Sequence, residues 1–306
     1  MQTSRIPRCV LPSEIVPALL LSLALSACRQ SVVPVPTPTS LPVEQSEPLP
    51  TNVPVIEPQP TLAQVPYAVA WIREDEPLTV RQPAGITSMA VASLASDQRG
   101  LTVTGKTTQM GSSTWVEINL PAGGKGWING WNLTEDVPSS SFCEDARISD
   151  LANQFIVAVS ERDGGTLARL VSPKRGLTIR HDWWNPEVNF SLSSVSGLFL
   201  DPAPMKWGVN RDSELEIDGT FRAVILPQLE DVFSIAPELN CNKLGAGSTA
   251  QDAIWPSEYS NMNYLSFYRA APVPGSQLNW RTWVLGIEYL DGQPYIALLV
   301  QYRGEI

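Results

Sequence analysis

The chain has 306 residues, of which 21 are basic and 31 acidic, so its formal net charge at pH 7 is −10. An acidic chain with only five lysines argues against nucleic acids and anionic membrane surfaces as partners, because both carry negative charge themselves. Its single histidine, His181, excludes a zinc site built from two histidines.

The first 27 residues have the pattern of an export signal that is removed from the mature protein. Arg5 and Arg8 supply positive charge, and the thirteen residues from Ile15 to Ala27 carry none. That run is too short to span a bilayer core, which takes about 20 residues. The segment ends in Leu25-Ser26-Ala27-Cys28, which resembles the lipobox of bacterial prolipoproteins. The resemblance implies an extracytoplasmic protein, lipid-anchored through Cys28 to the cell membrane or outer membrane; an ordinary secretory signal is the alternative.

Residues 28–66 form a proline-rich linker after the predicted lipidation site. Ten prolines lie between Pro34 and Pro66. Proline lacks the amide donor and restricts the residue before it, so neither a helix nor a central strand is expected here. A polyproline-II spacer of this length reaches on the order of 100 Å at about 3.1 Å per residue. We therefore expect the linker to hold the folded part away from the membrane.

The four cysteines are consistent with export. Cys9 belongs to the signal segment and Cys28 takes the lipid, which leaves Cys143 and Cys241. An even pair in an exported chain favours a disulfide, since the compartment is oxidising. Two buried free thiols are the alternative.

Residues 67–137 contain short apolar runs separated by turn residues, which is typical of a small all-β domain. In order they read L-T-V-R from Leu78, G-L-T-V from Gly100, W-V-E-I from Trp115 and G-W-I from Gly126. This order resembles bacterial SH3-type (SH3b) domains. Thr79 stands where the family has Asn, the turn proline is shifted to Pro83, and residues 87–94 do not match the family pattern. The resemblance implies an SH3-like barrel that binds peptidoglycan or a wall-associated peptide and carries no chemistry of its own.

Three tryptophans of this domain, Trp115, Trp127 and Trp131, are the candidate ligand-binding residues. Indole faces stack well on sugar rings and on peptide backbone. Filling the core is the alternative for Trp115 and Trp127. Trp131 follows Gly130 near the end of a strand, so it is the best candidate for exposure.

Residues 100–107 match the P-loop pattern G-x-x-x-x-G-K-T letter for letter. A working P-loop needs a helix after it whose N-terminus faces the phosphate. Here three of the four intervening residues are β-branched and favour a strand, and the residues that follow are typical of a turn. We therefore expect a strand and no nucleotide.

Residues 141–306 predict an α+β domain that resembles no characterised family. Ser141 and Glu144 have the spacing of a capping box. Trp280 and Trp283 are three residues apart on a predicted strand, so they sit on opposite faces. An outward indole would belong to a docking surface, and filling of the core is the favoured role for each. Apolar residues at helical spacing over 148–159 predict a helix of about 15 residues that ends near Gly164-Gly165. The other predicted elements are a short helix over 167–171, a strand over 177–180, a helix over 221–233 interrupted at Pro227, a strand over 263–269, and a C-terminal antiparallel hairpin of 281–289 with 295–302 around Asp291-Gly292.

These residues assign no catalytic group, and the sequence points to no cofactor or metal. His181-Asp182 has the composition of an acid–base dyad, although a lone histidine beside two tryptophans is more often structural. The pairs Asp212 with Glu214 and Glu216 with Asp218 have the groups that glycoside hydrolysis uses, although carboxylates of this kind usually lie on the solvated surface.

The sequence thus predicts a multi-domain, non-catalytic lipoprotein of the cell envelope: an anchor, a spacer, an SH3b-like domain over 67–137 and an α+β domain over 141–306. Binding of peptidoglycan or of a wall-associated peptide or protein is the favoured role. An accessory subunit of an envelope complex and a wall hydrolase targeted by the SH3b-like domain are the alternatives.

Overall fold

The structure is a computed structural model that describes residues 65–304, apart from 212, 248–252 and 274–277. All of the described residues belong to one compact unit. The predicted signal segment, the predicted lipidation site Cys28 and nearly all of the linker lie outside the described residues. Within 65–304 and apart from those gaps, no helix combines the length and the apolar character that a membrane span requires.

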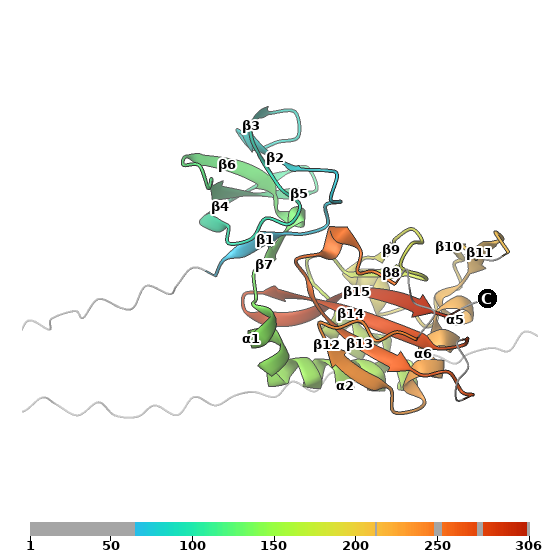
Figure 1. Cartoon of the computed structure of the whole chain (residues 1–306). Helices are drawn as coiled ribbons and strands as arrows, with labels where there is room; N and C mark the ends of the chain where they lie inside the picture. The colour runs from blue at the N-terminus through green and yellow to red at the C-terminus, as the bar shows by residue number, and fades with distance from the viewer. Residues whose placement is uncertain (1–64, 212, 248–252, 274–277, 305–306) are drawn as a thin grey trace, which may run out of the picture. The chain divides into compact units, whose positions relative to one another are not determined.

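Residues 65–137 form an all-β domain, as predicted. Five antiparallel strands make one sheet in the order β3-β2-β6-β5-β4, and β1 pairs with β7 in a second sheet (Figure 1). The five-stranded sheet is open, with β3 and β4 at its edges, so residues 65–137 do not form a closed barrel. The strands are β1 (Tyr67–Val69), β2 (Leu78–Gln82), β3 (Met89–Leu94), β4 (Thr102–Met110), β5 (Ser113–Asn119), β6 (Lys125–Asn129) and β7 (Leu133–Glu135), with a 3-10 turn η1 (Gly130–Asn132) before β7.

The β domain folds around alternating apolar residues. In β2, Leu78 and Val80 are buried while Thr79 between them is partly exposed, which is the period that a half-buried strand requires. Residues 102–107 of the P-loop-like segment lie in β4, where Gly105 has a φ of +85° at a shift in register against β5. They therefore form a strand with an irregularity, as the β-branched residues predicted.

The helices of the α+β region begin with α1 (Ser139–Glu144) and α2 (Ala146–Glu161). The predicted capping box is wrong: Ser141 and Glu144 lie inside α1, and the side chain of Asp145 caps α2 by accepting a hydrogen bond from the backbone N–H of Arg147. The predicted helix over 148–159 is confirmed, and so is the break near Pro227. The remaining helices are α3 (Gly164–Leu170), α4 (Leu192–Val195), α5 (Phe221–Val224), α6 (Leu226–Phe233) and the 3-10 turn η2 (Ser257–Tyr259).

A six-stranded sheet in the order β12-β13-β14-β15-β8-β9 forms the centre of the α+β region (Figure 1). The predicted C-terminal hairpin is confirmed: Asp291 and Gly292 both have positive φ, as a tight hairpin turn requires. The parallel pairing of β15 with β8 was not predicted. The strands are β8 (Leu177–Arg180), β9 (Val188–Phe190), β12 (Glu238–Cys241), β13 (Asn263–Arg269), β14 (Arg281–Leu290) and β15 (Gln293–Arg303); β10 (Met205–Val209) and β11 (Glu216–Gly219) form a separate hairpin.

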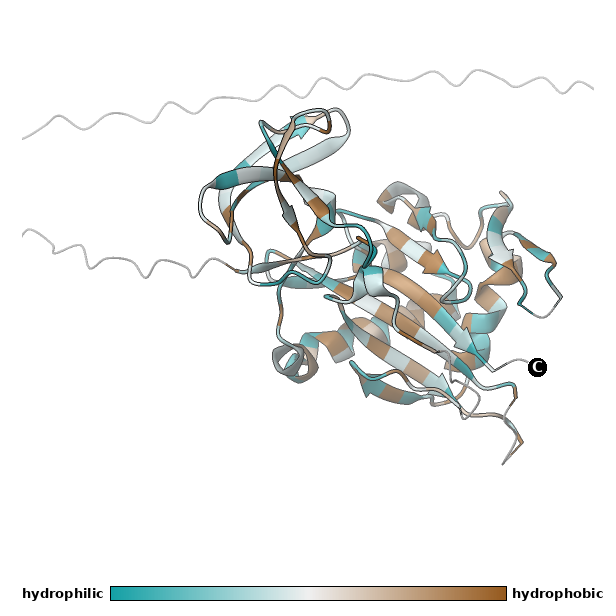
Figure 2. Cartoon of the chain, turned by 45° about the horizontal axis from the view of Figure 1, so that its top comes forward, coloured by the Kyte–Doolittle hydropathy of each residue, from teal (hydrophilic) through white to brown (hydrophobic). Residues whose placement is uncertain are grey.

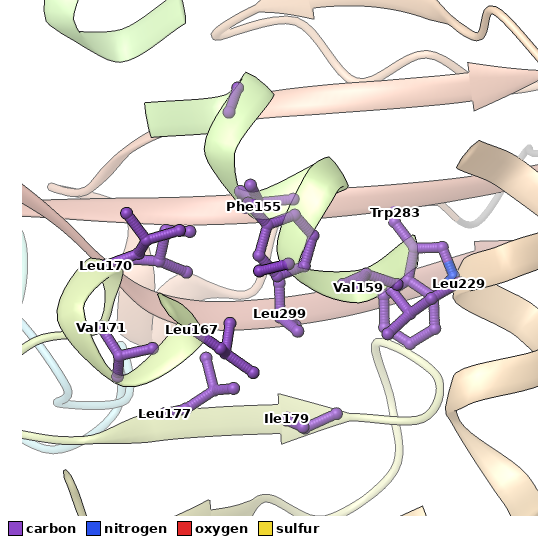
Figure 3. Packing of buried hydrophobic residues seen from close by; sticks show 14 of the residues in the cluster. Phe155, Val159, Leu167, Leu170, Val171, Leu177, Ile179, Leu229, Trp283 and Leu299 are labelled. Carbon is purple, nitrogen blue, oxygen red and sulfur yellow. The ribbon is translucent and has the colours of Figure 1, made fainter. Parts of the chain in front are cut away.

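Both faces of the six-stranded sheet are buried, and apolar residues recur along its strands (Figure 2). On one face, Phe155 and Val159 of α2 pack near Leu299 and Trp283 (Figure 3). On the other face, Trp280 packs in a second cluster with residues such as Tyr259. Trp280 and Trp283 therefore both fill the core, as favoured from the sequence, and neither forms an outward docking surface, because separate clusters of side chains bury them.

The predicted disulfide between Cys143 and Cys241 is present and joins α1 to β12. It closes a loop with a sequence separation of 98 residues. The bond ties the first helix of the α+β region to an edge strand of its sheet.

Candidate functional site

The turn between α3 and β8 directs two basic side chains, Lys174 and Arg175, toward the β domain. Ser172 Oγ shapes this turn by accepting hydrogen bonds from the backbone N–H groups of Lys174 (3.2 Å) and Arg175 (3.1 Å). Gly176 ends the turn with a φ of +72°, and a Cβ there would lie 2.0 Å from the carbonyl oxygen of Phe190. Only glycine fits that position, so Gly176 allows the turn that carries both basic groups to close.

Arg175 joins the β domain to the α+β region. Its side chain and that of Glu288 on β14 are completely buried, and Arg175 Nε lies 2.8 Å from Glu288 Oε2. The guanidinium also donates to the carbonyl oxygens of Leu133 (2.7 Å) and Trp131. Its central carbon lies 4.0 Å from the ring centroid of Trp71 and 5.0 Å from that of Trp131, which are cation–π distances. Burial lowers the pKa of Arg175, and Glu288 opposes that shift.

A groove of about 730 Å³ lies beside this junction. Hydroxyl groups of the β4–β5 hairpin line one part of the groove, and apolar side chains of the β domain line another part. The α+β region contributes Lys174 and Leu290. The polar and aromatic side chains that line the groove include Thr107, Ser112, Ser113, Thr114, Trp131 and Lys174.

Of the three tryptophans that the sequence singled out, only Trp131 lines the groove. It is 38% exposed, and its ring makes an edge contact with Trp71 at a centroid separation of 6.5 Å. The backbone N–H of Trp131 donates to Asn129 Oδ1 (3.0 Å), which fixes the turn that carries it. Trp115 is buried, and Trp127 is half-buried on β6 outside the groove. Of these three indoles, the structure therefore exposes that of Trp131 in the groove, in contact with Arg175.

Lys174 is the residue of the groove that the sequence analysis missed. Its Nζ donates to the carbonyl oxygen of Leu133 (2.6 Å). The residue as a whole is exposed, and its ammonium group is the part enclosed by protein. This enclosure and the neighbouring charge of Arg175 lower the pKa of Lys174 to about 7, against the opposing effect of Glu288 and Glu135. In the sequence, this turn is marked only by the basic pair Lys174-Arg175 directly before Gly176, in a chain that has few lysines.

The candidate acid–base groups lie apart from this groove. His181 is 2% exposed, and Gln228 Nε2 donates to its Nε2 over 2.8 Å. Asp182 Oδ2 forms an ion pair with Arg303 Nε (3.2 Å). His181 is therefore enclosed by protein, where a substrate has no access to it.

The predicted carboxylate pairs lie around the β10–β11 hairpin. Glu216 forms an exposed ion pair with Lys206 (3.2 Å), and Glu214 and Asp218 are exposed. Asp212 lies outside the described residues. Among the residues that the structure describes, no group of three or more His, Cys, Asp or Glu side chains is placed to hold a metal ion.

The buried His181 makes the stability of the protein depend on pH. Burial, together with the charges of Arg303 and Arg281, lowers the pKa of His181 to about 4. An unfolded histidine titrates near pH 6.5, so below that pH the unfolded chain binds a proton that the folded chain refuses. We expect His181→Gln to remove up to about 3 kcal/mol of the stability loss between pH 6.5 and pH 4. Urea unfolding of both proteins at several pH values measures this difference, and parallel pH profiles would contradict it.

Comparison with known proteins gives no function for this chain. No protein-family model, curated protein or solved structure matches the chain.

Proposed function

We propose that this chain is a non-catalytic lipoprotein of the cell envelope that binds peptidoglycan in the groove beside Trp131. The observation that carries the proposal is an exposed indole, packed against Arg175 and Trp71, in a groove lined in part by hydroxyl groups. A sugar ring stacks on an indole face, and hydroxyl side chains exchange hydrogen bonds with sugar hydroxyls. Because Arg175 and Trp71 already pack against Trp131, we expect little side-chain entropy to be lost when a ligand binds.

Features of the sequence support the same role. The lipobox-like segment ending at Cys28 and the proline-rich linker suit a protein that works beyond a membrane at some distance from it. The resemblance of residues 67–137 to SH3b domains suits recognition of wall glycopeptide. The Cys143–Cys241 disulfide is consistent with an oxidising compartment.

A second candidate role, as an accessory subunit of an envelope complex, is favoured by exposed apolar side chains on the β domain. Ile86 and Met89 are 78% and 70% exposed, and Met110 is also exposed. The Cε of Met110 lies 3.5 Å from the Cβ position of Gly85, so Met110 approaches the segment that carries Ile86. Exposed apolar residues that gather in this way are typical of protein docking surfaces.

Removal of the indole tests the proposed function. We expect Trp131→Ala to weaken binding of the full-length chain to purified sacculi about tenfold, because a lost stacking contact is worth about 1–1.5 kcal/mol. Co-sedimentation over a range of sacculus concentrations measures the affinity. Trp127→Ala is the matched control, since Trp127 is a half-buried indole of the same domain outside the groove. Failure of the unchanged protein to sediment, or equal losses in the two variants, would favour the accessory role instead.

A further inference from the structure

We infer that Lys174 binds a carboxylate of the glycopeptide whose sugar stacks on Trp131, so that the β domain and the α+β region share one binding site. This inference rests on the proposed function and specifies the ligand: a sugar that bears a peptide with a free acid group. Trp131 and Lys174 line the same groove. The ammonium of Lys174 is held at the carbonyl of Leu133, two residues after Trp131, so the charge and the indole lie close together.

The charge distribution of the groove favours an anionic ligand. Among the described residues that line it, Lys174 is the only cation and none is a carboxylate. The acidic groups nearby are engaged elsewhere: Glu288 pairs with Arg175 (2.8 Å), and Glu135 accepts hydrogen bonds from the backbone N–H of Gly292 (3.3 and 3.2 Å). An ammonium in a partly enclosed groove attracts a carboxylate more strongly than one in bulk water, because the effective dielectric constant is lower.

The chemistry of peptidoglycan supplies this combination. Its sugars carry short peptides that end in carboxylates, so one fragment presents a ring for the indole and an acid for the ammonium. Lysine acts as a compact point charge with three donors, and Leu133 uses one of them, which leaves donors for the ligand. Thr107, Ser112, Ser113 and Thr114 supply neutral hydrogen-bonding groups for the rest of the fragment.

The pH dependence of binding follows from Lys174. Only its protonated form attracts the carboxylate, and its pKa in the free protein is lowered to about 7 by burial and by Arg175. A bound carboxylate favours the charged form, so affinity falls as the pH rises above 7. The charged and titratable groups around the ammonium are Arg175 on the same turn, Glu288 on β14, Glu135 on β7 and Tyr67 on β1, with Asp291 close to Glu135. A variant in which only Lys174 is replaced shows how much of the pH dependence of binding comes from Lys174 and how much from these other groups.

The experiment compares two probes on the full-length chain: a soluble disaccharide-peptide fragment of peptidoglycan, and the methyl ester of the same fragment. Isothermal titration calorimetry gives the dissociation constant of each at pH 6, 7 and 8.5. We expect the free acid to bind about tenfold more tightly than the ester at pH 6 and to lose that advantage by pH 8.5. Lys174→Gln removes the advantage at every pH, and Lys174→Arg restores it and flattens the pH profile, because arginine stays protonated.

The controls separate the inference from the proposed function. Lys206→Gln changes an exposed lysine outside the groove and leaves both affinities unchanged. Equal binding of acid and ester that is lost in Trp131→Ala and kept in Lys174→Gln overturns the inference and leaves the proposed function standing. Failure of both probes to bind the unchanged protein overturns both. A thermal unfolding curve for each variant shows that it is folded.

Discussion

Replacement of Arg175 by methionine should destabilise the protein by about 3–5 kcal/mol, the effect expected when one partner of a buried ion pair is removed. Glu288 would keep its charge with no exposed surface, and the carbonyl of Leu133 would lose a donor at 2.7 Å. Trp71 and Trp131 would also lose the cation that packs over their rings. Guanidinium unfolding followed by tryptophan fluorescence measures the change in the free energy of unfolding.

Two further variants make the interpretation specific. Arg162→Met removes an exposed arginine that pairs with Glu230 at 3.0 Å, and we expect a loss of only about 0–1 kcal/mol because the pair is solvated. Replacing Arg175 and Glu288 together, by methionine and leucine, should recover part of the loss, since no charge is left buried alone. A single Arg175→Met change as mild as Arg162→Met would show that the pair does not hold the two parts together.

Loss of the Cys143–Cys241 disulfide should produce the other large effect. In the chain-entropy model, a loop of about 100 residues stabilises the folded state by about 4–5 kcal/mol, because the bond restricts the unfolded chain. We expect the midpoint of urea unfolding to fall when a reductant is added. The sequence separation of 98 residues places this bond near the upper end of that range.

A variant in which serine replaces both Cys143 and Cys241 is the control for this experiment. It should unfold at the low midpoint of the reduced protein, with or without reductant. A wild-type midpoint that does not respond to reductant, under conditions in which free thiols are detected chemically, would contradict the expected contribution of the bond.

The sequence predicted those elements whose signals are local. The spacing of Ile148, Leu151, Phe155 and Val159 found α2, and Asp291-Gly292 found the β14–β15 hairpin. The start of α2 was predicted wrongly, because Asp145 and Ser141 are both good capping residues and α1 already includes Ser141. A local pattern does not show which of two adjacent caps a tertiary fold will use.

The candidate site could be predicted only in part. Trp131 stood out through its place beside Gly130 at the end of a strand, and the structure leaves it exposed. Lys174 and Arg175 have no such signal, because their roles come from contacts with residues more than 40 positions away, such as Leu133 and Glu288. The burial of Trp280 likewise depends on residues that are distant in the sequence and cover the second face of the sheet.

The separation of Arg175 from Glu288 has a consequence for biogenesis. The two residues are 113 positions apart, and Glu288 belongs to the strand that precedes the final hairpin turn. During synthesis, the β domain and the turn that carries Arg175 are therefore made before Glu288, whose carboxylate neutralises the Arg175 guanidinium. Until β14 emerges, the arginine must stay hydrated rather than enter the junction, since burying it alone is strongly unfavourable. We therefore expect the contact between the β domain and the α+β region at Arg175 to form only after β14 is available.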